Sequence, residues 1–244
     1  MKTSGHIALI TGGGTGIGLA LAEQLTLHGN TVILCGRRRA PLVAAKSRLP
    51  NLYYRVCDLS KPISRVALAQ WVTTRFKHLD LLVNNAGIQR TVDFLKGDRD
   101  LEDADQEIAI NLAAPIHLSA LLIPLLRRQR EPAIVNISSG LAFTPLAAVP
   151  VYCATKAAIH SLCLSLRFQL RQTSIKVFEI APPIVPTGLS GRRPRPEDSD
   201  HSMSPSDVAK GVVRALRNDR YEVALGPAAG LHKRREALFA AIND

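Results

Sequence analysis

The sequence lacks the long apolar run that a membrane-spanning helix needs. Its longest apolar stretch, residues 116–126, contains Pro124 and leads directly into Arg127 and Arg128, whereas a spanning helix takes about 20 apolar residues. A secretory signal is not apparent either, because the short apolar run at 7–10 gives way at once to glycines. We therefore expect a cytoplasmic protein without a membrane partner.

Cysteine and aromatic residues are scarce as well. The chain has 244 residues, of which four are cysteines, and aromatic residues make up 5%. The cysteines (Cys35, Cys57, Cys153 and Cys163) show neither a CxxC pair nor the spacing of a zinc site. They are predicted to be reduced thiols in the core, and no metal site is expected.

Acidic residues are too few to balance the basic ones. The chain has 31 Lys and Arg against 20 Asp and Glu, a net charge of +11. The basic clusters are scattered and few aromatic rings could stack on bases, so we do not expect a nucleic-acid partner. A solvated basic surface is the simplest explanation. An alternative is that Arg192, Arg193 and Arg195 lie on a lid that favours an anionic substrate.

Apolar runs rich in β-branched residues alternate with helical patterns along the chain. Strands are expected at 7–10, 31–35, 52–57, 81–84, 133–138, 176–181 and 222–225. Helices are expected at 16–27, from 41, and at 62–76, 101–128, 151–171, 205–218 and 228–242. Such alternation is typical of a parallel sheet covered on both faces. The sequence thus predicts one domain, 1–244, with a doubly wound α/β Rossmann fold of about seven strands, in which 186–204 form a mobile substrate lid.

A glycine-rich turn follows the first expected strand. Glycine allows a tight turn and a close approach of the backbone to a pyrophosphate, which the N-terminus of the next helix would attract. A purely structural turn is the alternative. The candidate cofactor contacts in this turn are Gly12, Gly14, Thr15, Gly16, Ile17 and Gly18.

The end of the second strand carries arginines where an acidic residue would bind a ribose 2′-hydroxyl. Arg37, Arg38 and Arg39 follow Gly36, and an arginine fork suits a 2′-phosphate. We therefore predict NADP(H) rather than NAD(H), with contacts from Arg37 and Arg38. A solvated basic turn is the alternative.

Tyr152 and Lys156 are four residues apart, which places them on one face of the expected helix. A cation beside a phenol lowers the phenol's pKa, so that the tyrosine can exchange a proton with a substrate near neutral pH. Ser139 follows the fifth strand and could hydrogen-bond the same substrate oxygen.

These motifs together resemble the short-chain dehydrogenase/reductase family. The matching pieces occur in the family's order and are Thr11-Gly12-x-x-x-Gly16-x-Gly18, Asp58, Asn84–Gly87, Asn111, Ser139 and Tyr152-x-x-x-Lys156. Within the family the chain is similar to the DltE-type oxidoreductases, through the segments Gly16–Glu23, Asn84–Gln89 and Val149–Lys156. We take the name of that subgroup as a label and not as evidence of a substrate.

The resemblance implies a role for each catalytic residue. Tyr152 would be the general acid in reduction and the base in oxidation. Lys156 would lower the pKa of Tyr152 and hold the nicotinamide ribose. Ser139 would orient the substrate carbonyl, and Asn111 would hold a water that links Lys156 to solvent. The further cofactor contacts that it implies are Asp58, Leu59, Asn85, Ala86, Gly87, Pro182, Val185 and Thr187.

One position departs from the family pattern, because Pro183 stands where the family usually has glycine. Proline cannot take a positive φ, so the loop beneath the nicotinamide could follow another path. The resemblance also implies a homodimer or homotetramer formed through helices 101–128 and 151–171. Leu162, Leu166 and Leu170 are either such an interface or core.

The sequence therefore predicts an NADP(H)-dependent enzyme that interconverts a small-molecule carbonyl and an alcohol. A protein of another class, an NADP(H)-binding sensor or scaffold without turnover, is the alternative. The apolar residues 141–143, with Leu146 and Val149, form either one wall of the substrate pocket or simple loop packing.

Overall fold

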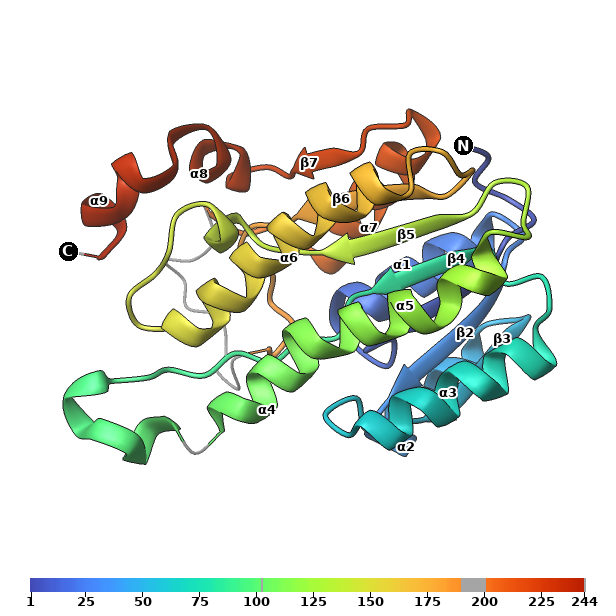
Figure 1. The fold of residues 1–244 in the computed structure, drawn as a ribbon, viewed down its shortest axis with the longest axis horizontal. Coiled ribbons are helices and arrows are strands. Elements are labelled where there is room, and N and C mark those ends of the chain that lie inside the picture. The colour runs from blue at the N-terminus through green and yellow to red at the C-terminus, as the bar shows by residue number, and fades with distance from the viewer. Residues whose placement is uncertain (102, 190–200, 244) are drawn as a thin grey trace.

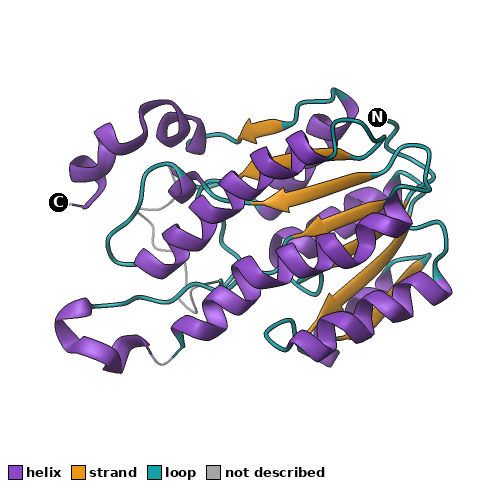
Figure 2. Cartoon of the chain, viewed as in Figure 1, coloured by secondary structure: helices purple, strands orange, loops and turns teal. Residues whose placement is uncertain are grey.

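The computed structural model describes residues 1–101, 103–189 and 201–243. Its strands form one parallel sheet of seven, in the order β3-β2-β1-β4-β5-β6-β7 (Figures 1 and 2). The strands are β1 (Ile7–Thr11), β2 (Thr31–Gly36), β3 (Leu52–Val56), β4 (Leu81–Asn84), β5 (Ala133–Ile137), β6 (Lys176–Ala181) and β7 (Glu222–Ala224). The fold is therefore the doubly wound α/β fold that the alternation predicts.

Helices cover both faces of the sheet. They are α1 (Gly16–Leu27), α2 (Arg39–Arg48), α3 (Pro62–Arg75), α4 (Ala104–Ile108), α5 (Ala114–Leu126), α6 (Pro150–Gln169), α7 (Pro205–Arg217), α8 (Ala228–Arg234) and α9 (Phe239–Asn243). One core layer joins α1, α2 and α7 to the sheet, and the other joins α3, α5 and α6. In Figure 1, α3, α5 and α6 lie in front of the strands.

The strands are apolar on both sides because both sides are covered. In β1, Ala8 and Ile10 pack into the layer of α1, whereas Leu9 between them packs into the layer of α3 and α5. Successive side chains of a strand point to opposite faces, so a sheet between two helical layers needs a continuous apolar run. The same reason explains why these runs predict the strands so closely.

All strands end at the same edge of the sheet, on the left in Figure 1. The strand order reverses between β1 and β4, and ligands of open α/β sheets bind in the crevice at such a switch point. The cofactor and catalytic residues predicted from the sequence lie in the loops after β1, β2, β3, β4, β5 and β6, with two groups of exceptions. Gly16, Ile17 and Gly18 lie in the first turn of α1, and Asn111, Tyr152 and Lys156 lie farther along the helical segments 104–126 and 150–169.

The helix expected at 101–128 is shorter and less regular. It begins at Ala104, ends at Leu126 and contains a π-helical turn at Ala109–Ala113. Pro115 is the second residue after this turn and has no N–H to donate to the carbonyl of Asn111, four residues earlier, which favours the wider turn.

The same helix also corrects the expectation about apolar length. Residues 104–126 are long and apolar enough to cross a membrane by length and composition alone, since an 18-residue window within them has a mean hydropathy of 1.9. Leu118 and Leu122 of this helix are fully buried in the core, and core helices of globular proteins commonly meet the same criterion. The absence of a membrane partner stays a prediction.

The terminal helix expected at 228–242 is broken. Arg235 has a φ of 47° and a ψ of −133°, and no α-helix continues through that conformation. The chain forms α8, a short 3₁₀ turn at Arg235–Leu238, and α9. Most other element bounds agree with the sequence prediction to within two residues.

Candidate functional site

The turn between β1 and α1 depends on its glycines. Gly12 and Gly16 have positive φ angles of 65° and 57°, which side chains rarely tolerate. A Cβ on Gly12 would lie 2.9 Å from the Cα of Ala86, and one on Gly18 would lie 2.6 Å from Nδ2 of Asn85. The turn therefore packs against the loop after β4 only because these positions lack side chains.

Asn85 and Ala86, in the loop after β4, are hydrogen-bonded to Thr11 at the start of the glycine turn. The backbone N–H groups of Asn85 and Ala86 both donate to Oγ1 of Thr11, at 2.9 and 3.0 Å, and the Asn85 side chain donates to the Thr11 carbonyl at 2.8 Å. The side chain of Asn85 thus shapes the cleft by holding its two walls together.

The N-terminus of α1 is open to an anion. Within the described residues, Thr15 makes no side-chain cap for this helix and no acidic residue occupies its first turn. The first N–H groups of a helix have no partner inside the helix, and they carry its positive dipole end. The predicted contacts Gly14, Thr15, Gly16 and Ile17 all lie here, in an arrangement that fits a pyrophosphate.

The ends of β2 and β3 place basic and acidic groups side by side. Arg37 and Arg38 are exposed, and Asp58 accepts hydrogen bonds from the backbone and hydroxyl of Ser60 at 3.1 and 2.7 Å. The Ser60 hydrogen bond, aided by the charge of Arg37, holds the pKa of Asp58 below its usual value. Leu59 beside it is buried.

Ser139, Tyr152 and Lys156 come together in a nearly solvent-free place. All three are buried, and so is Asn111. Ser139 follows β5, and the other two lie one turn apart on α6. The ammonium of Lys156 donates to the Ile137 carbonyl at 2.8 Å and lies 5.5 Å from the centroid of the Tyr152 ring.

Burial dominates the electrostatics of this pair. It raises the pKa of Tyr152 above its ordinary value, against the lowering by a hydrogen bond with Ser139, and it lowers the pKa of Lys156 to about 8. Desolvation is the largest influence on the Tyr152 phenol and Lys156 is not among the others, so the role of Lys156 in lowering this pKa stays a prediction. Tyr152 therefore carries its proton at neutral pH, as a proton donor must.

Asn111 lies in the π-helical turn and binds the loop after β4. Its Oδ1 accepts from the N–H of Ile88 at 2.9 Å, and its Nδ2 donates to the Ile88 carbonyl at 2.8 Å and to Oγ1 of Thr155 at 3.3 Å. Oδ1 would also lie 3.4 Å from a Cβ on Gly87. The side chain joins α6 to the cleft wall, and its water-holding role stays a prediction.

Glu107 belongs to this neighbourhood and was missed in the sequence. It is fully buried, and neither carboxylate oxygen has a hydrogen-bond partner among the described residues. Burial raises its pKa to about 7, although the nearby charges of Arg90 and Lys156 lower it. The available signal is its position in an apolar helix, four residues before Asn111.

The loop after β6 reaches across to the glycine turn. The side chain of Thr187 would lie 2.8 Å from a Cβ on Gly16, and its N–H donates to the Val185 carbonyl at 2.8 Å. The Pro182 carbonyl accepts from the N–H of Gly140 at 3.0 Å. The predicted lid arginines Arg192, Arg193 and Arg195 lie outside the described residues.

Apolar side chains surround Tyr152. Val149 and Cys153 form a buried cluster with it, and Leu141, Leu146 and Leu189 pack against this cluster. Phe143 instead makes edge-to-face contacts with His160 and His232. Of the apolar residues considered for a pocket wall, Phe143 therefore belongs to a different environment.

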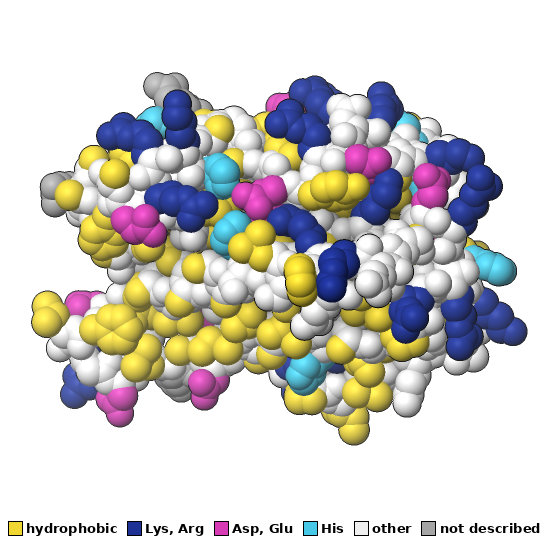
Figure 3. Space-filling model, turned by 45° about the horizontal axis from the view of Figure 1, so that its top comes forward, with side chains coloured by type: hydrophobic (Ala, Val, Ile, Leu, Met, Phe, Trp, Pro, Cys, Tyr) yellow, Lys and Arg dark blue, Asp and Glu magenta, His cyan; other side chains and the backbone are white. Residues whose placement is uncertain are grey.

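Leu166 and Leu170 are buried in the core, and Leu162 packs against the same core layer. Of the two alternatives, interface or core, the structure therefore places these leucines in the core. Other apolar side chains of the neighbouring helices are exposed, namely Leu164 and Phe168 on α6 and Ile116 and Leu121 on α5. In Figure 3, hydrophobic side chains gather in a band across the lower half of the molecule, whereas Lys and Arg form separate groups along its upper and right edges.

The four cysteines are buried free thiols, as expected. Burial is the main influence on Cys35, Cys57 and Cys163, and it raises the pKa of each thiol. Such thiols are poor nucleophiles, and none of them enters the chemistry considered below.

Comparisons with known proteins agree with the geometry. The family described as short chain dehydrogenase matches residues 6–198. DltE of Bacillus subtilis (strain 168), an uncharacterized oxidoreductase, is 45% identical over 248 residues, which cover 100% of this chain and 98% of DltE.

Two solved structures show how widely the fold is shared. A short chain dehydrogenase from Burkholderia cenocepacia, in complex with NADP, is 26% identical with a TM-score of 0.85 and 99% of both chains covered. A short chain dehydrogenase/reductase from Burkholderia phymatum, in complex with NAD, is 22% identical with a TM-score of 0.83, covering 96% of this chain and 94% of that one. The second likeness shows the fold alone.

Proposed function

This chain belongs to the short-chain dehydrogenase family of oxidoreductases, and we propose that it uses NADP(H) to interconvert a carbonyl and an alcohol. The observation that carries the proposal is the burial of Ser139, Tyr152 and Lys156 together, at the strand edge that also holds the glycine turn. The substrate would be a small molecule.

The proposed cofactor fits the residues at the switch point. The glycines leave room for a pyrophosphate against the backbone, and the open N-terminus of α1 would hold its charge. Exposed Arg37 and Arg38 are suited to a 2′-phosphate, and one relative's structure contains NADP. When bound, the cofactor supplies the hydride and the protein supplies orientation and the proton.

Tyr152 would act as the acid in the reducing direction. Its raised pKa keeps the phenol protonated, so it can donate its proton to the carbonyl oxygen as negative charge develops there. The Ser139 hydroxyl would donate a hydrogen bond to the same oxygen. Lys156 would stabilise the phenolate that remains, since its buried ammonium lies 5.5 Å from the ring centroid. In oxidation the phenolate would take the proton back.

Further properties belong to the proposal as well. The exposed apolar residues of α5 and α6, with Phe168 at 66% exposed, support a homodimer or homotetramer formed through these helices. We also propose that the protein acts in the cytoplasm.

Consumption of NADPH, followed by absorbance across a panel of ketones, aldehydes, quinones and oxoacids, tests the proposal. Turnover should exceed that with NADH, disappear in Tyr152→Phe and persist in the control Tyr53→Phe, since Tyr53 lies on β3 away from the site. If the protein binds NADPH but does not oxidise it with any compound of the panel, the proposed enzymatic activity is refuted and a sensor or scaffold is favoured. A preference for NADH would refute the role of Arg37.

A further inference from the structure

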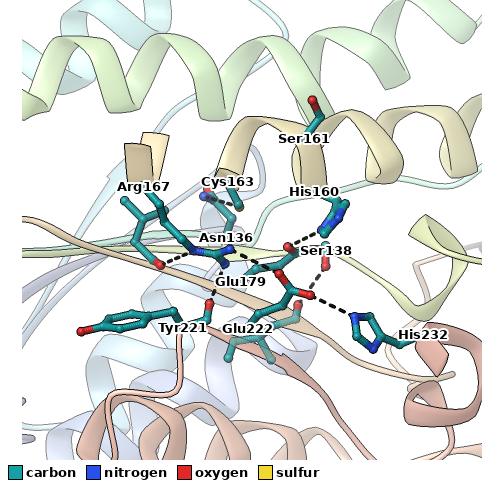
Figure 4. Close-up of polar contacts among 12 residues, drawn as sticks. Asn136, Ser138, His160, Ser161, Cys163, Arg167, Glu179, Tyr221, Glu222 and His232 are labelled. Atoms are coloured by element: carbon teal, nitrogen blue, oxygen red, sulfur yellow. Dashed lines mark hydrogen bonds and ion pairs between the residues drawn. The ribbon is translucent and has the colours of Figure 1, made fainter. Parts of the chain in front are cut away.

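A second group of polar side chains lies between α6, β6, β7 and α8. It comprises His160, Glu179, Glu222 and His232, and we call it the His–Glu cluster (Figure 4). Nδ1 of His160 lies 2.8 Å from Oε2 of Glu179, and Nε2 of His232 lies 2.9 Å from Oε1 of Glu222. The two carboxylates lie side by side between the two imidazole rings.

Glu179 is the unusual member of the His–Glu cluster. Its side chain is 0% exposed, and its Oε1 has no hydrogen-bond partner among the residues that the structure describes. A buried carboxylate oxygen without a partner costs free energy. One ligand atom from each of His160, Glu179 and Glu222 lies within 4.8 Å of the other two, so the Glu179 carboxyl has potential co-ligands beside it.

The charges of the cluster leave room for a cation. Arg167 donates to Oε2 of Glu222 at 3.3 Å and to the Tyr221 carbonyl at 2.7 Å. Among the described residues, two carboxyl groups thus meet one guanidinium and two imidazole rings, a donor set with room for a metal ion.

We propose that the His–Glu cluster binds one divalent transition-metal ion, with Zn²⁺ as the best match. The ligands would be His160, Glu179 and Glu222, with Nε2 of His232 as the fourth. Imidazole nitrogen and carboxylate oxygen suit Zn²⁺ in tetrahedral geometry at about 2.0–2.2 Å. Ligand atoms would then lie about 3.3 Å apart, so the atoms of His160, Glu179 and Glu222, now within 4.8 Å of one another, would close by up to about 1.5 Å.

The proposed ion has a route of entry. The side chain of Glu179 is fully buried at the inner end of the cluster, whereas the side chains of Glu222 and His232 are 29% and 35% exposed to solvent. Water and ions can therefore reach the cluster from the side of α8. Arg167 would stay bonded to Oε2 of Glu222 and leave Oε1 for the metal.

A metal here would stiffen the loop that carries Ser139. Phe143, four residues after Ser139, contacts the rings of both His160 and His232, with centroids 4.9 and 4.4 Å apart. Thr144 donates to the carbonyls of Leu231 and Arg235, at 3.2 and 2.9 Å. The ion would thus join α8 to β6, β7 and α6 around this loop, without touching the reacting atoms.

Calorimetric titration of tag-free, chelator-treated protein with ZnCl₂ tests the proposal. We expect one Zn²⁺ per chain, and a melting temperature that rises by about 5 to 10 °C at a hundredfold excess over the dissociation constant. Glu179→Gln and His232→Ala should each weaken binding at least tenfold. The control His78→Ala, at an exposed position outside the cluster, should bind as the wild type does.

Circular dichroism establishes whether each variant is folded. If Glu179→Gln does not fold, the comparison with wild type rests on His232→Ala, because His232 is half-exposed. The proposal is overturned if the wild type does not bind Zn²⁺, or if both cluster variants bind as tightly as His78→Ala. Because the readout is metal binding, a failure of the proposed oxidoreductase reaction would leave this test unaffected.

Discussion

The buried carboxyl of Glu107 should make the protein's stability depend on pH. Burial disfavours its charged form and raises its pKa from 4.5 to about 7. Between these pH values the native state keeps a proton that the unfolded chain releases. The free energy of unfolding therefore falls as pH rises through this window, and the loss is complete above about pH 7.

The magnitude follows from the change in pKa. At about 1.36 kcal/mol for each tenfold change in proton affinity, a pKa raised from 4.5 to about 7 corresponds to about 3 kcal/mol. Glu107→Gln removes the ionisation and keeps a neutral polar group of similar size. Relative to the wild type, the variant should gain about 3 kcal/mol between pH 4.5 and pH 8, or roughly 6 to 12 °C in melting temperature.

Thermal and urea unfolding of the two proteins at matched pH values measures this gain. Other carboxyls titrate in the same range, so only the difference between variant and wild type is informative at each pH. Asp105→Asn is the matched control, because Asp105 is exposed on the same helix and this variant likewise replaces a carboxyl group by an amide. Parallel profiles for Glu107→Gln and the wild type would refute the reasoning.

Three further predictions concern the cofactor cleft. Arg37→Glu should weaken NADPH binding by about 10- to 100-fold in fluorescence titrations, with little effect on NADH, because it removes the charged hydrogen bond that we propose to the 2′-phosphate. Gly12→Ala should lower the melting temperature and cofactor affinity together, since its Cβ would lie 2.9 Å from Ala86; unchanged values would contradict the packing. Asn111→Ala should cost about 1–3 kcal/mol in urea unfolding by leaving the N–H and carbonyl of Ile88 unpaired, and an unchanged free energy of unfolding would contradict this account.

The parts of the fold that depend on local pattern could be predicted from the sequence. Strands such as β1 are apolar on both faces, and the glycine turn has a spacing that few other structures need, so both could be recognised without tertiary information. The spacing of Tyr152 and Lys156 likewise placed them on one helical face.

Tertiary packing decides the features that the sequence did not reveal. Glu107 resembles any acidic residue of a helix until α4 packs near α6 and removes its solvent. The His–Glu cluster draws one residue from each of four elements, separated by up to 72 positions from His160 to His232. The pKa of Tyr152 rises because desolvation outweighs the hydrogen bond with Ser139, a balance that residue spacing does not contain.

The most direct test of the central claim follows the hydride itself. The protein is incubated with a carbonyl substrate and with NADPH that carries two deuterium atoms at C4 of the nicotinamide, and the alcohol is analysed by mass spectrometry. We predict one deuterium on the former carbonyl carbon in the product of the wild type, and no labelled alcohol with Tyr152→Phe. Oxidation of NADPH without deuterium in the alcohol, or equal labelling by Tyr152→Phe, would contradict the account.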